Sequence, residues 1–208
     1  MQRIAVFASG RGSNFLALLE AEKEKLFPGR IVLLLSDQQD AGAIELAREH
    51  DLPVFVLPPG RGKGRLSEAE EISLRDACQL SGVQWICLAG FMRILRGPLL
   101  EAYPDRILNI HPSLLPSFPG LHAQKQAWEF GVKVAGCSVH FVDQGVDSGP
   151  LVLQKEVRVR EGESSGDLSA RILAEEHQLY AEALRRLFTD PWERRDRRIV
   201  FTERERKS

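Results

Sequence analysis

Five short runs rich in Ile, Val and Leu recur through the first half of the chain, and helical patterns separate them. Runs that are apolar at nearly every position are typical of strands buried on both faces of a sheet. The strand-like runs span residues 3–8, 30–35, 54–57, 85–89 and 107–110. The helical patterns span residues 15–25, 43–50, 67–80 and 98–103. This alternation predicts an α/β fold with a Rossmann-like, doubly wound and mostly parallel sheet.

The order of the elements changes in the second half of the chain. A helical pattern at 123–130 is followed by two consecutive strand-like runs at 136–142 and 151–159. Because no helix separates these two runs, we expect antiparallel strands at one edge of the sheet. A long amphipathic pattern over 167–188 predicts a C-terminal helix that closes the fold.

Length and composition predict an ordinary soluble protein with one large globular domain. The 208 residues are 43% hydrophobic and contain no linker, so we expect one domain over residues 1–190. Residues 191–208 alternate basic and acidic side chains from Arg194 onwards, which is typical of a solvated and loosely held charged tail. Three widely spaced cysteines indicate reduced core residues, neither a disulfide framework nor a zinc site.

The net charge gives no reason to expect nucleic acid or a membrane as a partner. A formal net charge of −1 gives no electrostatic argument for nucleic acid or for an anionic membrane. No apolar run approaches the roughly 18 residues that a spanning helix needs, and a strand begins without a charged leader. We therefore expect a cytoplasmic protein, with a monomer and a homodimer both left open.

The segment Asn109–Pro116 has the composition of a catalytic loop. Asn109 and His111 are two residues apart at the end of a predicted strand, so their side chains should project the same way. The prolines that follow stiffen the loop and hold both groups in place. Further along, Asp147 lies in an Asp-Ser-Gly-Pro turn after an alternating strand. The three side chains together predict an acyl-transfer site.

A glycine-containing turn, Gly10–Asn14, joins the first strand to the first helix. Free N–H groups and the helix dipole at such a junction favour an anion. Phe15 replaces the third glycine of a dinucleotide fingerprint, and no Lys-Ser or Lys-Thr follows the glycines, so neither a Rossmann cofactor site nor a Walker site is expected. A cradle for one phosphate remains, formed by Gly12, Ser13 and Asn14. A plain turn with Ser13 or Asn14 as a helix cap is the alternative.

A third segment, Leu88–Leu95, follows the fourth predicted strand. Ligands of doubly wound sheets lie just outside the carboxyl ends of the strands, so all three segments should face one crevice. The apolar wall of Phe91, Ile94 and Leu95 suits a flat heteroaromatic ligand. Core packing would also explain these apolar residues, but it gives no reason for Gly90 and Arg93 between them.

Taken together, these motifs resemble the phosphoribosylglycinamide formyltransferase family, which is folate-dependent and belongs to purine biosynthesis. The resemblance extends from Ile4 to about Tyr180. Methionyl-tRNA formyltransferases and formyltetrahydrofolate hydrolases share the Asn-x-His and Asp elements. The Gly-Ser-Asn turn and the Pro-Gly-Leu-His continuation resemble the glycinamide ribonucleotide enzyme, and the extra domains expected of the other two classes are not seen. The motifs are Gly10–Asn14, Ala89–Leu95, Asn109–Pro116, Pro119–His122, Ser138–Val142 and Asp147–Pro150.

The resemblance implies the formyltransferase fold and roles for individual residues. Gly12, Ser13 and Asn14 would hold the ribonucleotide phosphate, and Glu176 would contact the glycinamide end. The folate pocket would be lined by Met92, Arg93, Ile94, Leu95 and Asn109, partly through backbone atoms. Arg65 is the candidate for a folate-contacting arginine, although its glycine-rich surroundings are equally typical of a mobile surface loop.

The implied reaction is formyl transfer from 10-formyltetrahydrofolate, a co-substrate, to the amine of N1-(5-phospho-D-ribosyl)glycinamide. Asn109 and a protonated His111 would stabilise the oxyanion, with Asp147 raising the pKa of His111. No metal is expected, because no three ligands have a credible spacing. His122 and His140 are interpreted as structural. A formyltetrahydrofolate hydrolase is the alternative enzyme, and a phosphate-binding module without chemistry is the alternative outside catalysis.

Overall fold

A nine-stranded mixed sheet forms the centre of the protein in the computed structural model, which describes residues 1–58 and 64–202. The spatial order of the strands is β10-β11-β9-β8-β7-β5-β1-β2-β3. Five of them, β7 to β3 in that order, are mutually parallel. These five are β1 (Gln2–Phe7), β2 (Gly29–Ser36), β3 (Val54–Val56), β5 (Trp85–Leu88) and β7 (Ile107–His111). The doubly wound parallel half that the sequence predicts is therefore confirmed.

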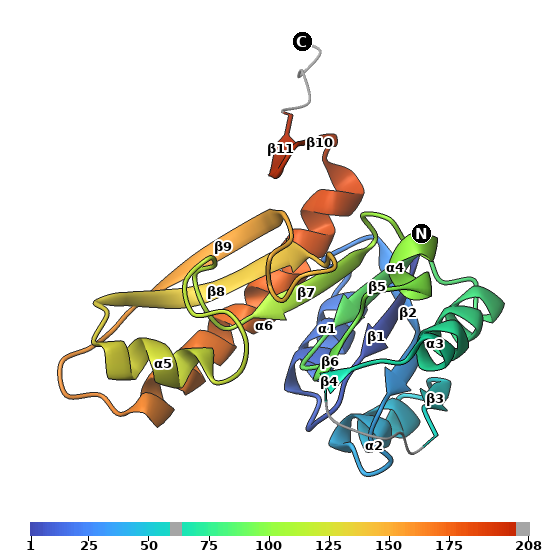
Figure 1. Ribbon diagram of the computed structural model, residues 1–208, viewed down its shortest axis with the longest axis horizontal. Coiled ribbons are helices and arrows are strands. Elements are labelled where there is room, and N and C mark those ends of the chain that lie inside the picture. Colours follow the sequence, from blue (N-terminus) through green and yellow to red (C-terminus); the bar gives the residue numbers. More distant parts are fainter. Residues whose placement is uncertain (59–63, 203–208) are drawn as a thin grey trace.

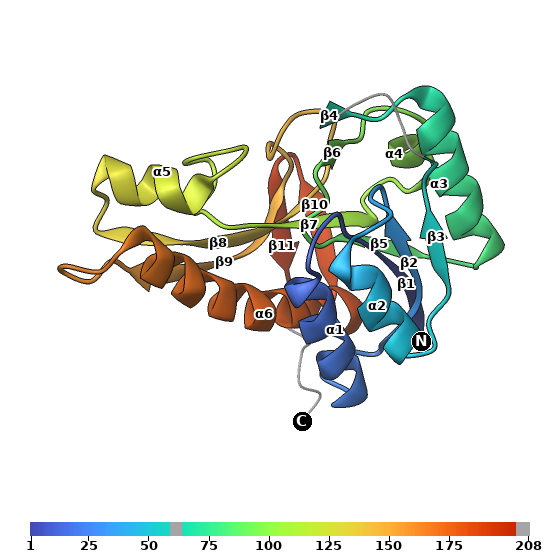
Figure 2. The ribbon, with the colours of Figure 1, turned by 90° about the horizontal axis from the view of Figure 1, so that it is seen from below.

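Two hydrophobic cores lie on opposite faces of the sheet, and alternate residues of β1 enter each of them. Ile4 and Val6 belong to one core, whereas Ala5 and Phe7 belong to the other. Helices α1, α2 and α6 cover the first face, and α3 and α4 cover the second (Figure 2). The helices are α1 (Ser13–Lys23), α2 (Gly42–Glu49), α3 (Glu68–Leu80), α4 (Pro98–Ala102), α5 (Ala123–Phe130) and α6 (Ser165–Thr189).

Capping side chains define where two of these helices begin. Ser67 accepts a hydrogen bond from the backbone of Glu70, whose side chain accepts one in return, and this capping box starts α3. Ser164 and Asp167 form the same arrangement at the start of α6. Each reciprocal pair satisfies two backbone donors that the first turn of a helix leaves without partners.

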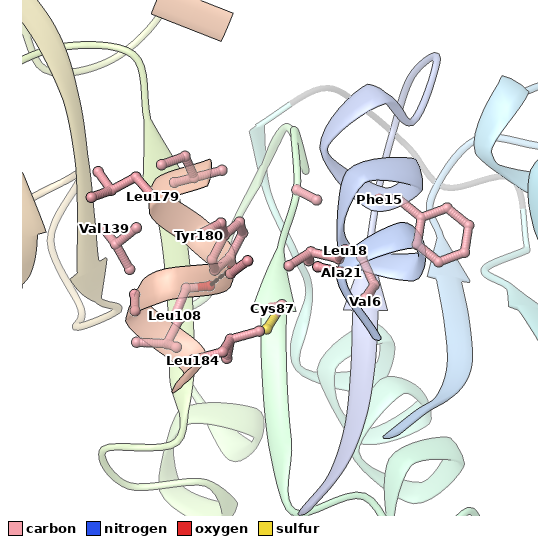
Figure 3. Close-up of a cluster of buried hydrophobic side chains, with 14 of the residues drawn as sticks. Val6, Phe15, Leu18, Ala21, Cys87, Leu108, Val139, Leu179, Tyr180 and Leu184 are labelled. Atoms are coloured by element: carbon pink, nitrogen blue, oxygen red, sulfur yellow. Dashed lines mark hydrogen bonds between the residues drawn. The ribbon is translucent and has the colours of Figure 1, made fainter. Parts of the chain in front are cut away.

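The long helix α6 ties the centre of the sheet together, as the sequence predicts for a closing C-terminal helix. Tyr180 is fully buried, and its hydroxyl lies 3.2 Å from the carbonyl oxygen of Leu88 and 3.1 Å from that of Leu108. Figure 3 shows this side chain between the strands, packed beside Leu179 and Leu184 of the same helix. Because Leu88 ends β5 and Leu108 lies in the adjacent strand β7, the helix is fixed to both strands.

The sheet extends further beyond its parallel half than expected. Strand β8 (Val134–Phe141) pairs antiparallel with both β7 and β9 (Leu151–Arg158), which confirms the two predicted antiparallel strands. After α6 the chain forms a hairpin of β10 (Trp192–Arg195) and β11 (Arg198–Phe201), and β11 lies next to β9 in the sheet. The hairpin is visible beside the end of α6 in Figure 1. The hairpin occupies the edge position that the sequence assigned to β9.

The hairpin also corrects the expectation of a loosely held tail. Trp192 packs against Phe141 with ring centroids 5.6 Å apart, and Arg198 pairs with Leu151 of β9. The guanidinium of Arg194 lies 2.6 Å from the carboxylate of Asp105. The alternating charges suggested a solvated segment, but a two-stranded hairpin exposes one face, and these charges lie on the exposed strands. Residues 203–208 lie outside the described residues.

Candidate active site

The three segments singled out by the sequence meet at one edge of the sheet. Strands β7, β5 and β1 are adjacent and parallel, so their carboxyl ends adjoin. The turn after β1 holds Gly12, the loop after β5 holds Met92, and β7 itself ends at His111. The backbone N–H of Ser9 donates to the carbonyl of Gly90, which joins the first two segments directly. The predicted common location is therefore observed.

Asn109 contacts two side chains of the neighbouring antiparallel part. Its Nδ2 lies 3.2 Å from Nε2 of His140 and 3.4 Å from Oδ1 of Asp147. His140 is the residue paired with Asn109 across β7 and β8, and its Nδ1 lies 2.8 Å from the carbonyl oxygen of Phe141. These contacts of its two ring nitrogens hold the His140 imidazole in place beside Asn109. The two contacts of Nδ2 together hold the Asn109 amide in one orientation.

His111 is buried between two acceptors. Its Nδ1 lies 3.3 Å from Oδ2 of Asp147, and its Nε2 lies 2.9 Å from the carbonyl oxygen of Phe118. A neutral imidazole can donate to only one of these oxygens, whereas an imidazolium donates to both. These two acceptor oxygens therefore favour the protonated form of His111.

Burial nevertheless lowers the pKa of His111 below its ordinary value. Removal of the ring from water is the largest influence, and it outweighs the opposing effects of the Phe118 carbonyl and the Asp147 carboxylate. As predicted from the sequence, the charge of Asp147 acts to raise this pKa. The net shift is nevertheless downward, so a protonated His111 is not the form favoured in the ligand-free protein; the proximity of Asp147 could be predicted from the sequence, but the extent of burial could not.

Asp147 lies in the turn between β8 and β9 with a left-handed backbone, φ 49°. Although burial opposes it, the pKa of Asp147 is lowered by hydrogen bonding with His140 and the Gly120 N–H and by the charge of His111. The Gly120 N–H donates to Oδ2 at 2.8 Å. The Asp147 carboxylate thus contacts Asn109, His111 and the backbone of Gly120 in the proline loop.

The turn before α1 leaves backbone donors open toward this edge. Gly12 has φ 83°, and a Cβ there would lie 2.9 Å from Cα and Cβ of Ala43 in α2, so glycine is required by both conformation and packing. No side chain within the described residues caps α1, so the alternative of a Ser13 or Asn14 cap is not observed. The first N–H groups of the helix stay available for an anion.

The buried Asn14 is joined to Glu176 of α6. Its Nδ2 donates to Oε2 of Glu176 at 2.7 Å, and no hydrogen-bond partner is found for its Oδ1 among the described residues. Glu176 is only 4% exposed, and burial raises its pKa to about 7, against the lowering effect of the Asn14 hydrogen bond. One turn further along α6, Tyr180 fixes the helix to the sheet, so Glu176 has a rigid support.

The predicted folate-lining residues differ in how their side chains are placed. Met92 is exposed and Ile94 is half-buried, whereas Leu95 is buried in the second core. The Arg93 side chain is 7% exposed and is committed to the protein: Nη2 lies 3.1 Å from Glu70, and Nε donates to the carbonyl of Gly64. Nε and Nη2 are thus committed to the protein, and Nη1 lies 3.9 Å from the carboxylate of Asp37.

Arg65 lies in a small second sheet. Strand β4 (Gly64–Arg65) pairs parallel with β6 (Arg93–Ile94), and the carbonyl of Arg65 accepts a hydrogen bond from Arg93. The Arg65 side chain is exposed. The glycine-rich segment before it, from Gly60 to Lys63, lies outside the described residues.

A structural role was expected for His140, and the structure places it in contact with Asn109 and 3.6 Å from Asp147. The signal available in the sequence was register: two antiparallel strands that follow one another bring a specific residue opposite Asn109. His122 is exposed and begins α5 in a left-handed conformation.

Within residues 1–58 and 64–202, no group of three or more His, Cys, Asp or Glu side chains is arranged to hold a metal ion. None of the helices in this part of the chain combines the length and the apolar character needed to cross a membrane.

Comparison with known proteins gives a single family. The formyl transferase family model matches residues 2–184. The chain is 41% identical to the phosphoribosylglycinamide formyltransferase of Bacillus subtilis, over 90% of this chain and 95% of the relative. It is 39% identical to part of the human trifunctional purine biosynthetic protein adenosine-3, over 88% of this chain but only 18% of that protein.

Solved structures agree with these relatives. Glycinamide ribonucleotide transformylase 1 from Symbiobacterium toebii superimposes with a TM-score of 0.91 at 47% identity, covering 98% of this chain and 95% of the other. A formyltetrahydrofolate deformylase from Pseudomonas syringae has a TM-score of 0.87 at 26% identity, and the match covers 97% of this chain and 66% of the deformylase. With its Asn109, His111 and Asp147 cluster at the carboxyl edge of the sheet, the chain belongs to the formyl transferase family.

Proposed function

We propose that this protein transfers the formyl group of 10-formyltetrahydrofolate to the amine of N1-(5-phospho-D-ribosyl)glycinamide, giving the N2-formyl product and tetrahydrofolate in purine biosynthesis. The observation that carries the proposal is the contact of Asn109 and His111 with one carboxylate, Asp147, beside an uncapped glycine turn. The similarity to phosphoribosylglycinamide formyltransferases over nine tenths of the chain supports the choice of substrates.

The ribonucleotide is assigned to the side of the site next to α1. The backbone donors at Gly12, Ser13 and Asn14 suit its phosphate, since an anion at a helix N-terminus also meets the positive end of the helix dipole. Glu176 supports the proposal because its carboxyl can accept a hydrogen bond from an amine or amide of the glycinamide end. The unpartnered Asn14 Oδ1 offers one more buried acceptor beside it.

The folate is assigned to the segment after β5, where Met92 and Ile94 present apolar surface and the backbone presents polar groups. Leu95 contributes by packing beneath this wall, and Arg93 by anchoring it. Asn109 lies between the two proposed ligands. Arg65 is retained as a proposed folate contact because its side chain is exposed beside β6.

In the proposed reaction the glycinamide nitrogen bonds to the formyl carbon, and the carbon bond to N10 of the folate breaks. The developing oxyanion is stabilised by an N–H of Asn109 that exchanges its 3.4 Å contact with Asp147 for the oxyanion, while the contact with His140 keeps the amide oriented. His111 begins neutral, takes the proton released by the attacking amine, and delivers it to the departing N10. While His111 carries the proton, Asp147 and the Phe118 carbonyl stabilise the imidazolium.

Direct transfer is favoured over a covalent enzyme intermediate. Cys78, Cys87 and Cys137 are all buried, and burial raises the pKa of each thiol to about 12, so none supplies a thiolate nucleophile at neutral pH. The proposal places this chemistry in the cytoplasm on small polar substrates, with the enzyme as a monomer or a homodimer.

The competing reaction is hydrolysis, in which water replaces the amine, and the similarity to a deformylase makes it the relevant rival. Consumption of 10-formyltetrahydrofolate should be measured with and without the ribonucleotide. The proposal expects rapid consumption only when the ribonucleotide is present. Equal rates in both reactions would support the hydrolase instead.

A further inference from the structure

A buried carboxylate on α3 takes no part in the chemistry described above. Glu71 is 2% exposed, and its Oε1 accepts the backbone N–H of Arg96 at 2.8 Å. Its Oε2 accepts the N–H groups of Gly97 at 2.9 Å and of Leu99 at 3.3 Å. One side chain therefore satisfies three backbone donors at the start of α4, where an acidic group also meets the positive end of the helix.

The residue before it, Glu70, holds the other end of the same segment. Its carboxylate lies 3.1 Å from Nη2 of Arg93, which donates to the carbonyl of Arg65 as well. Glu70 also completes the capping box with Ser67, so its position is fixed by the start of α3. Consecutive glutamates thus anchor the chain at both ends of Arg93–Leu99.

We infer that Glu70 and Glu71 are positioning residues for the folate pocket, with Glu71 fixing the backbone that follows Leu95 and Glu70 fixing Arg93. This inference rests on the proposed function, in which Met92–Leu95 line the pocket. A pocket that recognises a flat ligand partly through backbone atoms needs its backbone held in place, because displacement of a few tenths of an ångström weakens such contacts. The buried charge is stable there because hydrogen bonds compensate its desolvation.

The chain offers a matched control in the same helical turn. Glu68 is exposed and accepts no hydrogen bond among those of the described residues. Glu68→Gln therefore removes the same charge from the same turn without touching the segment after β5. Glu71→Gln replaces one acceptor oxygen by an NH₂ group that faces backbone donors. Glu70→Gln loses the charge beside Arg93 but keeps the capping box, which glutamine also supports.

Each variant should be titrated by calorimetry with tetrahydrofolate and, separately, with glycinamide ribonucleotide. Glu71→Gln is expected to weaken tetrahydrofolate binding about tenfold or more, as for the loss of one charge-assisted hydrogen bond, and Glu70→Gln should weaken it by a smaller factor. Ribonucleotide affinity should stay within about twofold in both, and Glu68→Gln should match the parent for both ligands. In steady state, KM for the folate should rise in Glu71→Gln while KM for the ribonucleotide stays unchanged.

Two results would overturn the inference: normal tetrahydrofolate affinity in both variants, or equal loss of both ligands, which would indicate general loss of the fold. If Glu71→Gln does not fold, Glu70→Gln provides the test. Its tetrahydrofolate affinity should fall more than its ribonucleotide affinity, although by a smaller factor. Failure of the proposed function is a separate outcome, since the parent protein itself would then not bind tetrahydrofolate.

Discussion

Oδ2 of Asp147 lies 3.3 Å from Nδ1 of His111, yet the pKa of the imidazole is lowered. The carboxylate favours the imidazolium, but burial of the ring favours the neutral form more strongly. His111 is therefore neutral in the resting protein at pH 7 and lies next to the groups that stabilise its protonated form. This combination suits a residue that takes up a proton during the reaction and then releases it.

The first prediction concerns the titration of His111 itself. Its midpoint, followed by NMR, should lie below the ordinary value of about 6.5. Asp147→Asn removes a charge that raises the pKa, so the midpoint should move to still lower pH and turnover should fall. An unchanged midpoint in Asp147→Asn would remove Asp147 from the proposed proton transfer and leave it as a residue of the turn.

The second prediction concerns the Asn109 amide. Asn109→Ala should lower kcat by roughly 10²–10³, the range for loss of one oxyanion donor, and should change the KM of either substrate little. His140→Ala should produce a smaller loss, because it only frees the amide to rotate. The account of Asn109 fails if the alanine variant raises KM while kcat is maintained, since Asn109 would then bind the ground state.

The third prediction links Glu176 to the pH dependence of stability. Its pKa in the folded protein is about 7 and its ordinary value is 4.5, so the folded state binds the extra proton between these values. The stabilisation is fully present below pH 4.5 and is lost as pH rises through 7. Glu176→Gln should therefore raise the free energy of unfolding at pH 8 by on the order of 1–3 kcal/mol and change it little at pH 4.5.

Denaturant unfolding at the two pH values measures this effect. The glutamine amide can also donate to the unpartnered Asn14 Oδ1, which adds to the expected gain. Ribonucleotide affinity should fall in the same variant, because a carboxyl acceptor is lost. Equal effects at pH 4.5 and pH 8 would show that Glu176 is not the group that titrates.

The fourth prediction tests the C-terminal hairpin. Trp192→Ala removes the contact with Phe141 and should cost about 2 kcal/mol of stability, below the roughly 3–5 kcal/mol typical of a fully buried Trp. Arg195→Ala, an exposed position in the same strand, is the control and should change stability by less than about 0.5 kcal/mol. If both variants unfold at the same denaturant concentration as the parent, the hairpin does not stabilise the sheet.

Much of the fold could be predicted from the sequence because its signals are local. Apolar runs identified the parallel strands, and the spacing of Asn109 and His111 placed both at the end of β7. The hairpin could not be predicted in the same way, because its residues are mostly charged and its contacts are distant in sequence: Trp192 packs against Phe141, about fifty positions earlier, and Arg194 pairs with Asp105. A contact of that separation leaves no pattern within the segment itself.

The site shows the same division between local and distant determinants. The identity of Asn109, His111 and Asp147 followed from motifs, whereas the direction of the His111 pKa depends on how deeply the fold buries the ring. Arg93 was singled out as a candidate contact because it interrupts an apolar segment. Its partner Glu70 lies on α3, more than twenty positions earlier, so the commitment of Arg93 to the protein could only be observed in the structure.

Formyl transfer to the ribonucleotide is the central claim, and following the label of ¹³C-formyl 10-formyltetrahydrofolate by NMR tests it most directly. With the ribonucleotide present and without added metal or ATP, the label should move from the folate to the amide of formylglycinamide ribonucleotide with no build-up of free formate. The His111→Ala variant should slow this transfer by roughly 10²–10⁴. Label that accumulates as formate, at the same rate with and without the ribonucleotide, would contradict the account and identify the protein as a hydrolase.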